Sequence, residues 1–329
     1  MDISTTYLGL NLKNPIVPSA SPLMEKLDNV KRMEEAGAGA VVLHSLFEEQ
    51  ITQEALQLHY HTTAHLDSFA EALSYFPDPG AYKFGGDEYV EYIRKVKEAV
   101  GIPVIGSLNG VTSGGWTQYA RHIQDAGADA IELNLYFVPT DPDVPGAKLE
   151  DAYLETVKAV KGAVTIPVAV KLSPFFTSLP AFGKRLQQAG VAGLVLLNRF
   201  YQPDLDIENR KVYPHIILSN PHSIRRTLRW IAILHGRLNL SLAATGGVHT
   251  ATDVIKLMMA GSDVTMMCSA LYKNGIGHIT EVVADLQMWL VEREYQSLGQ
   301  LKGSMSQKSV AEPAAFERAL YLKELQSFH

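Results

Sequence analysis

The sequence predicts a (β/α)8 TIM barrel, an α/β fold with a parallel eight-stranded sheet, on three observations. First, an Ala-Gly pair that closes a helix-like segment recurs four times, and an apolar β-rich run follows each pair. Second, four further apolar runs lie between these units, most of them led in by proline. Third, helical patterns fill the gaps, and strand–helix alternation implies right-handed βαβ units. Eight similar units favour a closed barrel over its rival, a doubly wound sheet.

Each strand is predicted from the residues that precede it. Glycine suits the left-handed residue that ends a helix, and the run behind it is typical of a strand buried on both faces. Proline stops a helix and starts an extended segment. In chain order the predicted strands are 14–20, 40–45, 102–108, 130–135, 166–172, 193–198, 239–245 and 264–269, with helical patterns at 87–100, 147–163 and 250–260.

The length fits one domain, 1–329. A barrel takes roughly 250 residues, which leaves about 80 for additions. We place this surplus in an insertion after the second strand, 46–86, and in a C-terminal extension, 296–329. No Gly/Ser linker separates either segment from the barrel.

The composition excludes several classes of protein. The net charge is −6 and no basic block occurs, which argues against nucleic acid as a partner. Cys268 is the single cysteine, so an intrachain disulfide, a CxxC zinc site and a four-cysteine iron–sulfur site are excluded. No signal peptide begins the chain, and no run approaches the ~18 apolar residues that span a bilayer. We expect a cytoplasmic protein without membrane contact.

Polar residues at the carboxyl ends of the strands mark the expected site, because active residues of such a barrel lie at that face. Lys171 is the most informative of them, since a lysine that ends a strand is costly to bury without a purpose or a partner. Gly246, Gly247 and Ser269 follow the last two strands, where loops of this fold commonly bind phosphate. The other strand-end residues are Ser19, Ala20, Ser21, His44, Ser45, Ser107, Asn109, Asn134, Asn198 and Thr245.

In order, these motifs resemble the dihydroorotate dehydrogenase family, especially its soluble class. The resemblance runs from Tyr7 to about Ser306 and is specific because ELNL and VKLSP occur at the family's spacing. The quoted motifs are NPIVPSASP, AVVLHS, SLNG, ELNL, VAVKLSP, LLN and ATGGVHTATDVIKLMMAGSDVTMMCSAL. The resemblance implies an FMN flavoprotein that oxidises a CH–CH bond next to a carbonyl, or reduces the corresponding alkene.

Carried over by position, the resemblance implies a role for each matching residue. Lys171 would sit beside the N1/O2 edge of the flavin, where a cation stabilises the anionic reduced ring. Asn134 and Asn198 would donate hydrogen bonds to the substrate. The remaining residues would contact FMN itself: Ala20, Ser21 and Ser45 the ring, and Gly246, Gly247 and Ser269 the phosphate. The family implies a homodimer and a separate electron acceptor, which for an iron–sulfur relay would be a partner chain.

The substrate half departs from the family pattern. The family base, a cysteine or a serine, falls on Phe137, and the family lysine of the second strand falls on His44. Two asparagines of the family have no counterpart here, where the corresponding segments are 74–80 and 138–146. A glycine-rich stretch of the family is replaced in this chain by residues 215–226. His44 is the best substitute base, because imidazole titrates near neutral pH; a histidine hydrogen-bonded beneath the loop is an equal alternative.

Other residues allow two interpretations. His59, His61 and His65 could suggest a metal site, but no carboxylate or cysteine completes the set, so we expect no metal. Glu48 and Glu49 fit either acid–base groups or a helix start. Arg225, Arg226 and Arg229 fit an exposed helix face. Arg199 is better placed to reach an anionic substrate. Tyr136 and Tyr201 fit either proton donors or packed aromatic residues.

Three functions remain open. The leading one is an FMN-dependent oxidoreductase acting on CH–CH donors, dihydroorotate dehydrogenase-like and pyrimidine-related but with an altered substrate site. The second is a flavin-free barrel lyase or aldolase that uses Lys171 as a Schiff base. The third is a non-catalytic flavin-holding subunit that relays electrons.

Overall fold

A computed structural model gives the fold of the chain. It describes residues 1–50, 86–110, 116–199, 202–213, 215–318, 321 and 325–326. Most of the predicted insertion at 46–86 therefore lies outside the described residues. The three histidines at 59, 61 and 65 lie wholly outside them.

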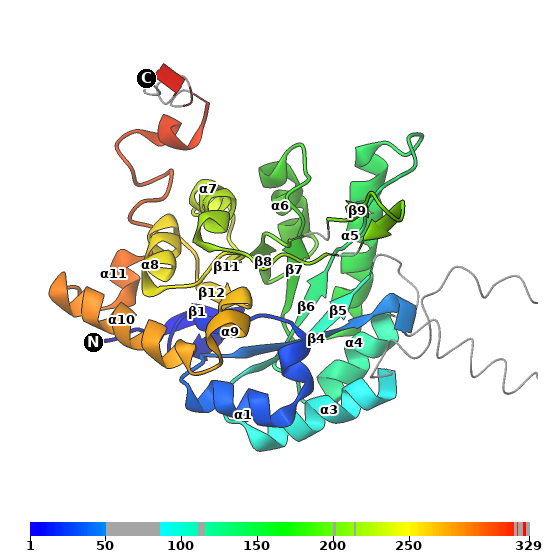
Figure 1. Ribbon diagram of the computed structural model, residues 1–329, viewed down its shortest axis with the longest axis horizontal. Helices are drawn as coiled ribbons and strands as arrows, with labels where there is room; N and C mark the ends of the chain where they lie inside the picture. Colours follow the sequence, from blue (N-terminus) through cyan, green and yellow to red (C-terminus); the bar gives the residue numbers. More distant parts are fainter. Residues whose placement is uncertain are drawn as a thin grey trace, which may run out of the picture.

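Eight parallel strands form one sheet in the part of the chain that the structure describes (Figure 1). Its hydrogen-bonded order is β3-β12-β11-β8-β7-β6-β5-β4. The two ends of this order meet, because the amide of Gly39 donates to the carbonyl of Ile16 over 2.8 Å. The strands are β3 (Ile16–Pro18), β4 (Val41–Phe47), β5 (Val104–Asn109), β6 (Ala130–Asn134), β7 (Val168–Leu172), β8 (Gly193–Leu196), β11 (Ser241–Thr245) and β12 (Val264–Met267). The prediction of a (β/α)8 barrel is confirmed, and all eight predicted strands are present.

Helices surround the barrel and bury their apolar faces against it (Figure 1). Most of them follow a strand, as the alternation in the sequence predicts. The helices are α1 (Leu27–Glu35), α3 (Gly86–Ala99), α4 (Trp116–Asp125), α5 (Gly146–Ala163), α6 (Leu179–Gln188), α7 (Ile224–Leu234), α8 (Ala251–Ala260), α9 (Ser269–Asn274), α10 (His278–Glu292) and α11 (Leu298–Leu301), with short 3-10 turns at η1 (Pro22–Glu25), η4 (Pro221–Ser223) and η5 (Pro313–Phe316).

The inside of the barrel is packed at its amino-terminal end. The hairpin of β1 (Thr5–Tyr7) and β2 (Leu10–Leu12) contributes Tyr7, Leu8 and Leu12 to a second apolar cluster. Small and branched residues from the eight strands complete this cluster, among them Ala130, Ala169 and Ala243. Among the described residues, the amino-terminal end is therefore filled by side chains, and the open end of the barrel is at the carboxyl ends of the strands.

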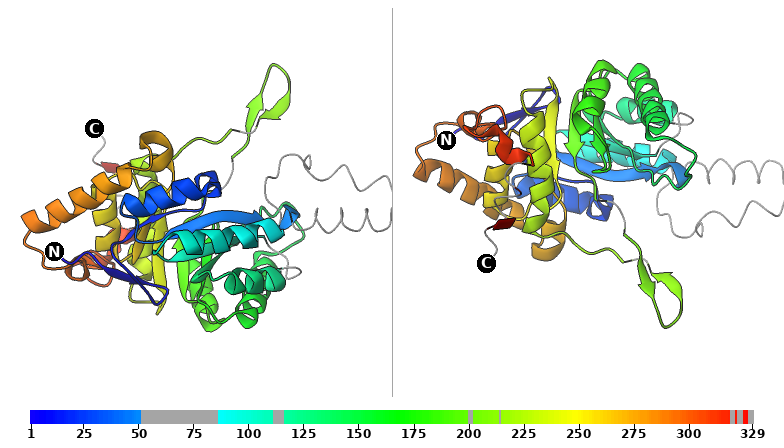
Figure 2. Two further views of the ribbon diagram at one scale, coloured as in Figure 1. Left: turned by 90° about the horizontal axis from the view of Figure 1, so that it is seen from below. Right: turned by 90° about the horizontal axis from the view of Figure 1, so that it is seen from above.

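Two additions depart from the plain barrel. The C-terminal extension packs back on the helices, since the amides of Gly303 and Gln307 donate to the carbonyls of Met258 on α8 and Ala232 on α7. A hairpin of β9 (Asp204–Asp206) and β10 (Lys211–Tyr213) projects from the body of the molecule (Figure 2). This hairpin, which follows β8, is not among the additions that the sequence predicts.

Candidate active site

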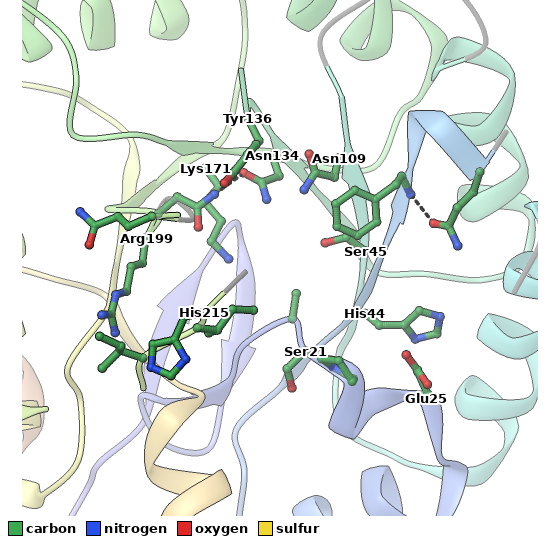
Figure 3. Close-up of a pocket in the computed structure, with 18 of the residues that line it drawn as sticks. Ser21, Glu25, His44, Ser45, Asn109, Asn134, Tyr136, Lys171, Arg199 and His215 are labelled. Atoms are coloured by element: carbon green, nitrogen blue, oxygen red, sulfur yellow. Dashed lines mark hydrogen bonds between the residues drawn. The ribbon is translucent and has the colours of Figure 1, made fainter. Parts of the chain in front are cut away.

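A cavity of about 930 Å³ opens at the carboxyl ends of the strands (Figure 3). Its volume lies within the range of ~300–1,000 Å³ that is usual for cofactor and ligand sites. Eight of the predicted strand-end residues line it together: Ala20, Ser21, His44, Ser45, Asn109, Asn134, Lys171 and Asn198. The position of this cavity agrees with the rule that active sites of barrels lie at this face.

Strand periodicity places Lys171 on the cavity floor. In β7 the side chain of Ala169 lies in the inner apolar cluster, whereas Val168 and Val170 face the outer core. Side chains alternate along a strand, so Lys171, two residues after Ala169, also faces inward. Its ammonium lies 3.1 Å from Oε1 of Glu132 and 3.5 Å from the hydroxyl of Ser19. Lys171 therefore has the buried partner that its position in the sequence requires.

Amide side chains stand beside this lysine (Figure 3). Asn134 ends β6 directly opposite Lys171 on β7, and Asn109 ends β5 opposite Asn134. The Nδ2 group of Asn198, just after β8, donates to Oδ1 of Asn134 over 2.9 Å. Two predicted substrate-binding residues are thus held together, and the Asn134 amide keeps its Nδ2 donors for a ligand.

Two hydroxyls complete the wall of the cavity. Ser45 Oγ lies 2.7 Å from Ser107 Oγ on the neighbouring strand. Ser21 Oγ is buried and has no hydrogen-bond partner among the described residues. A buried polar group normally has a partner, so this hydroxyl fits a site that is completed by a bound polar molecule.

His44 lies at the margin of the cavity with its ring turned from the centre (Figure 3). The pairing of β4 with β5 shifts register between Val42 and Ser45, and this irregularity points Ser45 inward. The ring of His44 packs instead on α3, edge-on to Tyr89 at 4.9 Å and tilted against Tyr92 at 5.5 Å. Burial lowers the pKa of His44 to about 4, against a smaller opposing effect of a backbone hydrogen bond at Met24. The ring is therefore neutral at pH 7.

Phe137, at the position of the family base, does not line the main cavity. It lies in a separate cavity of about 360 Å³ with Leu149, Tyr153 and Phe176. Tyr136, one residue earlier, does line the main cavity. The physical reason is that β6 ends at Asn134, after which the irregular chain no longer follows strand alternation.

The glycines after β11 allow close approach of another part of the chain. A Cβ atom on Gly247 would lie 2.7 Å from the amide nitrogen of Ile224 and 2.8 Å from the carbonyl oxygen of Asn220. The hydroxyl of Ser269 accepts a hydrogen bond from the amide of Ser219 over 3.0 Å. Gly247 and Ser269, two of the three predicted phosphate residues, therefore contact the segment that replaces the family's glycine-rich stretch.

Gly246 lines a side cavity of about 350 Å³ that shares Asn198, Arg199 and Gln202 with the main cavity. Ser219, Ser223 and Arg226 also line this side cavity, so Arg226 lies near a potential anion site although it is exposed. The sequence assigns Arg226 only to an exposed helix face, and its position at the start of α7 is the signal that could have linked it to an anion site.

Glu132 is the main residue that sequence reasoning missed. It lies within the apolar run 130–135, which the sequence identifies as a strand and which carries Asn134. A glutamate two residues before Asn134 must face the barrel interior by alternation, which is the signal that could have found it. His215, Ile216 and Ile217, which also line the cavity, lie in a segment without secondary structure and gave no signal.

Two further findings concern the described residues. No group of three or more histidine, cysteine, aspartate or glutamate residues among them is arranged to hold a metal ion. No helix within the described ranges has the length and apolar character needed to cross a membrane.

Comparison with known proteins identifies the family. The sequence model described as "Dihydroorotate dehydrogenase" matches residues 2–290. The chain is 29% identical over 310 residues to "Dihydroorotate dehydrogenase B (NAD(+)), catalytic subunit" of Thermoplasma volcanium, with 92% of this chain and 98% of that protein covered. It is 29% identical over 314 residues to the protein of the same name from Methanocella arvoryzae, with 92% and 97% covered. It is 26% identical over 316 residues to "Putative dihydroorotate dehydrogenase A (fumarate)" of Aeropyrum pernix, again with 92% and 97% covered. The chain belongs to the dihydroorotate dehydrogenase family.

Proposed function

We propose that this protein is an FMN-dependent oxidoreductase that acts on a CH–CH group of a small molecule, with a substrate site altered from that of its family. The observation that carries the proposal is the buried Lys171 ammonium on the floor of a large cavity, surrounded by amides and hydroxyls. The unpartnered hydroxyl of Ser21 and the side cavity at Gly246 and Arg226 fit the ring and the phosphate of FMN. When bound, FMN would supply the hydride acceptor or donor.

The residues of the chain would bind and orient the reactants. Lys171 places a positive charge where the reduced ring gains negative charge. Asn134 and Asn198, held together by their hydrogen bond, would orient carbonyl or amide groups of the substrate. Arg199 lines the same cavity and suits a carboxylate. Tyr136, Ile216 and Ile217 also line it, so we expect a substrate larger or more apolar than dihydroorotate.

Proton removal is the step in which this chain departs from its family. The position of the family base is Phe137, which cannot accept a proton and lies in another cavity. His44 stays our candidate for the base, because it lines the cavity with a neutral ring. A pKa of about 4 for His44 makes that ring a weak base. A well-placed base contributes typically ~10²–10⁴-fold to the rate, so we expect slow oxidation of dihydroorotate.

The lyase or aldolase alternative is less favourable. A Schiff-base lysine attacks as a neutral amine. Lys171 instead forms an ion pair with a carboxylate that is almost completely buried. The electron-relay alternative differs from the leading proposal only in lacking a substrate. For either flavin function we expect a separate electron acceptor, since Cys268 alone cannot hold an iron–sulfur cluster.

Titration of the flavin-free protein with FMN tests the proposal. We expect the wild-type protein to bind FMN, and the Lys171→Ala variant to bind it more weakly or with a lower reduction potential. Lys158→Ala, which removes an exposed lysine on α5, is the matched control and should bind like the wild type. A wild-type protein that takes up no FMN would refute the proposal.

A further inference from the structure

The Lys171–Glu132 pair is buried more completely than any ordinary surface salt bridge. The exposed fraction is 7% for the Lys171 side chain and 1% for that of Glu132. Oε1 of Glu132 accepts from the ammonium, while Oε2 is buried without a hydrogen-bond partner among the described residues. Burying two charges costs several kcal/mol per ion, and a half-satisfied carboxylate adds to that cost. Stability alone gives no reason for this arrangement.

The two charges lie at different depths. In the pairing of β6 with β7, Asn134 stands opposite Lys171, whereas Glu132 stands opposite Ala169, one inward-facing layer deeper. Lys171 lines the cavity, and Glu132 lies behind it towards the packed interior of the barrel. A ligand on the cavity floor therefore meets the ammonium first and the carboxylate behind it.

We propose that Glu132 is a positioning residue that fixes the Lys171 ammonium and partly cancels its charge, and thereby lowers the reduction potential of the flavin. This inference rests on the proposed function. A lone cation beside the ring would favour the reduced, more negative flavin strongly. A carboxylate 3.1 Å behind that cation opposes the effect, because its field has the opposite sign at the same ring. Glu132 itself does not line the cavity and would act through Lys171.

The Glu132→Gln variant separates charge from shape. Glutamine has nearly the same shape, and its Oε1 can still accept the hydrogen bond from Lys171. We expect the affinity for reduced FMN, relative to oxidised FMN, to rise by about tenfold, which corresponds to about +30 mV for a two-electron couple. Glu98→Gln on α3 removes one exposed negative charge and is the matched control, with an unchanged potential. An unchanged or lowered potential in Glu132→Gln would overturn the proposal.

A second pair of variants keeps the proposal testable if Glu132→Gln does not fold. Lys171→Ala leaves the buried carboxylate without its partner, which should destabilise the protein and lower the potential of any bound flavin. Adding Glu132→Gln to Lys171→Ala should raise both the melting temperature and the potential above those of Lys171→Ala alone. A double variant no better than Lys171→Ala in either property contradicts the proposal. Failure of the proposed function is distinct, because the wild-type protein would then bind no FMN.

Discussion

The irregular pairing in β4 decides what His44 can do. Regular alternation from Val42, which lies in the inner cluster, would turn His44 into the barrel. The register shift between Val42 and Ser45 instead directs Ser45 inward and leaves the imidazole against Tyr89 and Tyr92. Sequence identifies a histidine at the end of this strand, but not the bulge, because a bulge depends on pairing with the next strand.

The buried imidazole should make the protein less stable in acid. The pKa of His44 is about 4 in the folded protein, against 6.5 in the unfolded chain, so between these values only the unfolded state takes up the proton. Its contribution therefore destabilises the fold as pH falls from 6.5 to 4, by up to about 3 kcal/mol, and is constant below pH 4. We expect the loss of melting temperature between pH 7 and pH 4.5 to be smaller in His44→Gln than in the wild type.

An exposed histidine provides the comparison for this measurement. His222→Gln removes an imidazole at the surface and should leave the pH dependence of the melting temperature as it is in the wild type. Equal losses of melting temperature in the wild type and in His44→Gln would show that the imidazole is not held neutral by burial.

At the scale of elements, alternation in β6 and β7 explains most of the candidate site. Asn134 and Lys171 are predictable, because each polar residue ends an apolar strand of a barrel. Their pairing with Glu132 and Asn198 is not predictable in the same way, because it depends on which strands are neighbours and on their register. The direction of the Phe137 side chain is not predictable from alternation, because Phe137 lies beyond the end of β6.

Gly247 should be the least replaceable of the glycines near the proposed phosphate site. Its φ of +97° costs an L-residue about 1–2 kcal/mol, and its Cβ would collide with the backbone at Asn220 and Ile224. We expect the collision in Gly247→Ala to lower the free energy of unfolding by ~1–3 kcal/mol, in addition to the cost of the backbone strain. Chemical denaturation measures this loss.

Gly37→Ala isolates the two contributions. Gly37 has a φ of +102°, close to that of Gly247, and nothing lies within 4 Å of its would-be Cβ, so only the backbone strain applies. Equal destabilisation by Gly247→Ala and Gly37→Ala would show that the segment before α7 does not pack on Gly247 as closely as described.

For the whole molecule, the sequence predicts the barrel because eight apolar runs with helix breaks are a regular signal. It does not predict the β9–β10 hairpin, whose exposed strands lack the burial that makes a strand recognisable. Leu205, Ile207 and Val212 on this hairpin are 68%, 79% and 66% exposed. A two-stranded hairpin is marginally stable alone in water, so a partner surface would stabilise it.

We expect a homodimer in which this hairpin is covered. The double variant Leu205→Asp/Val212→Asp should shift the protein towards the monomer, because it places charges on the apolar surface of the hairpin. Met288→Asp, at an exposed apolar position on α10, is the control and should leave the mass unchanged. Sedimentation equilibrium measures both, and a wild-type protein that is monomeric throughout would contradict this expectation.

Reduction of the FMN-loaded protein by dihydroorotate, followed anaerobically in a stopped-flow instrument, tests the central claim that the cofactor site is kept while the substrate site is changed. We expect FMN to bind and dihydroorotate to reduce it slowly, because no family base faces the cavity. Phe137→Cys should remain slow, since residue 137 lies in the neighbouring cavity. Rapid reduction of the wild-type protein by dihydroorotate would show that the substrate site is not changed in this way.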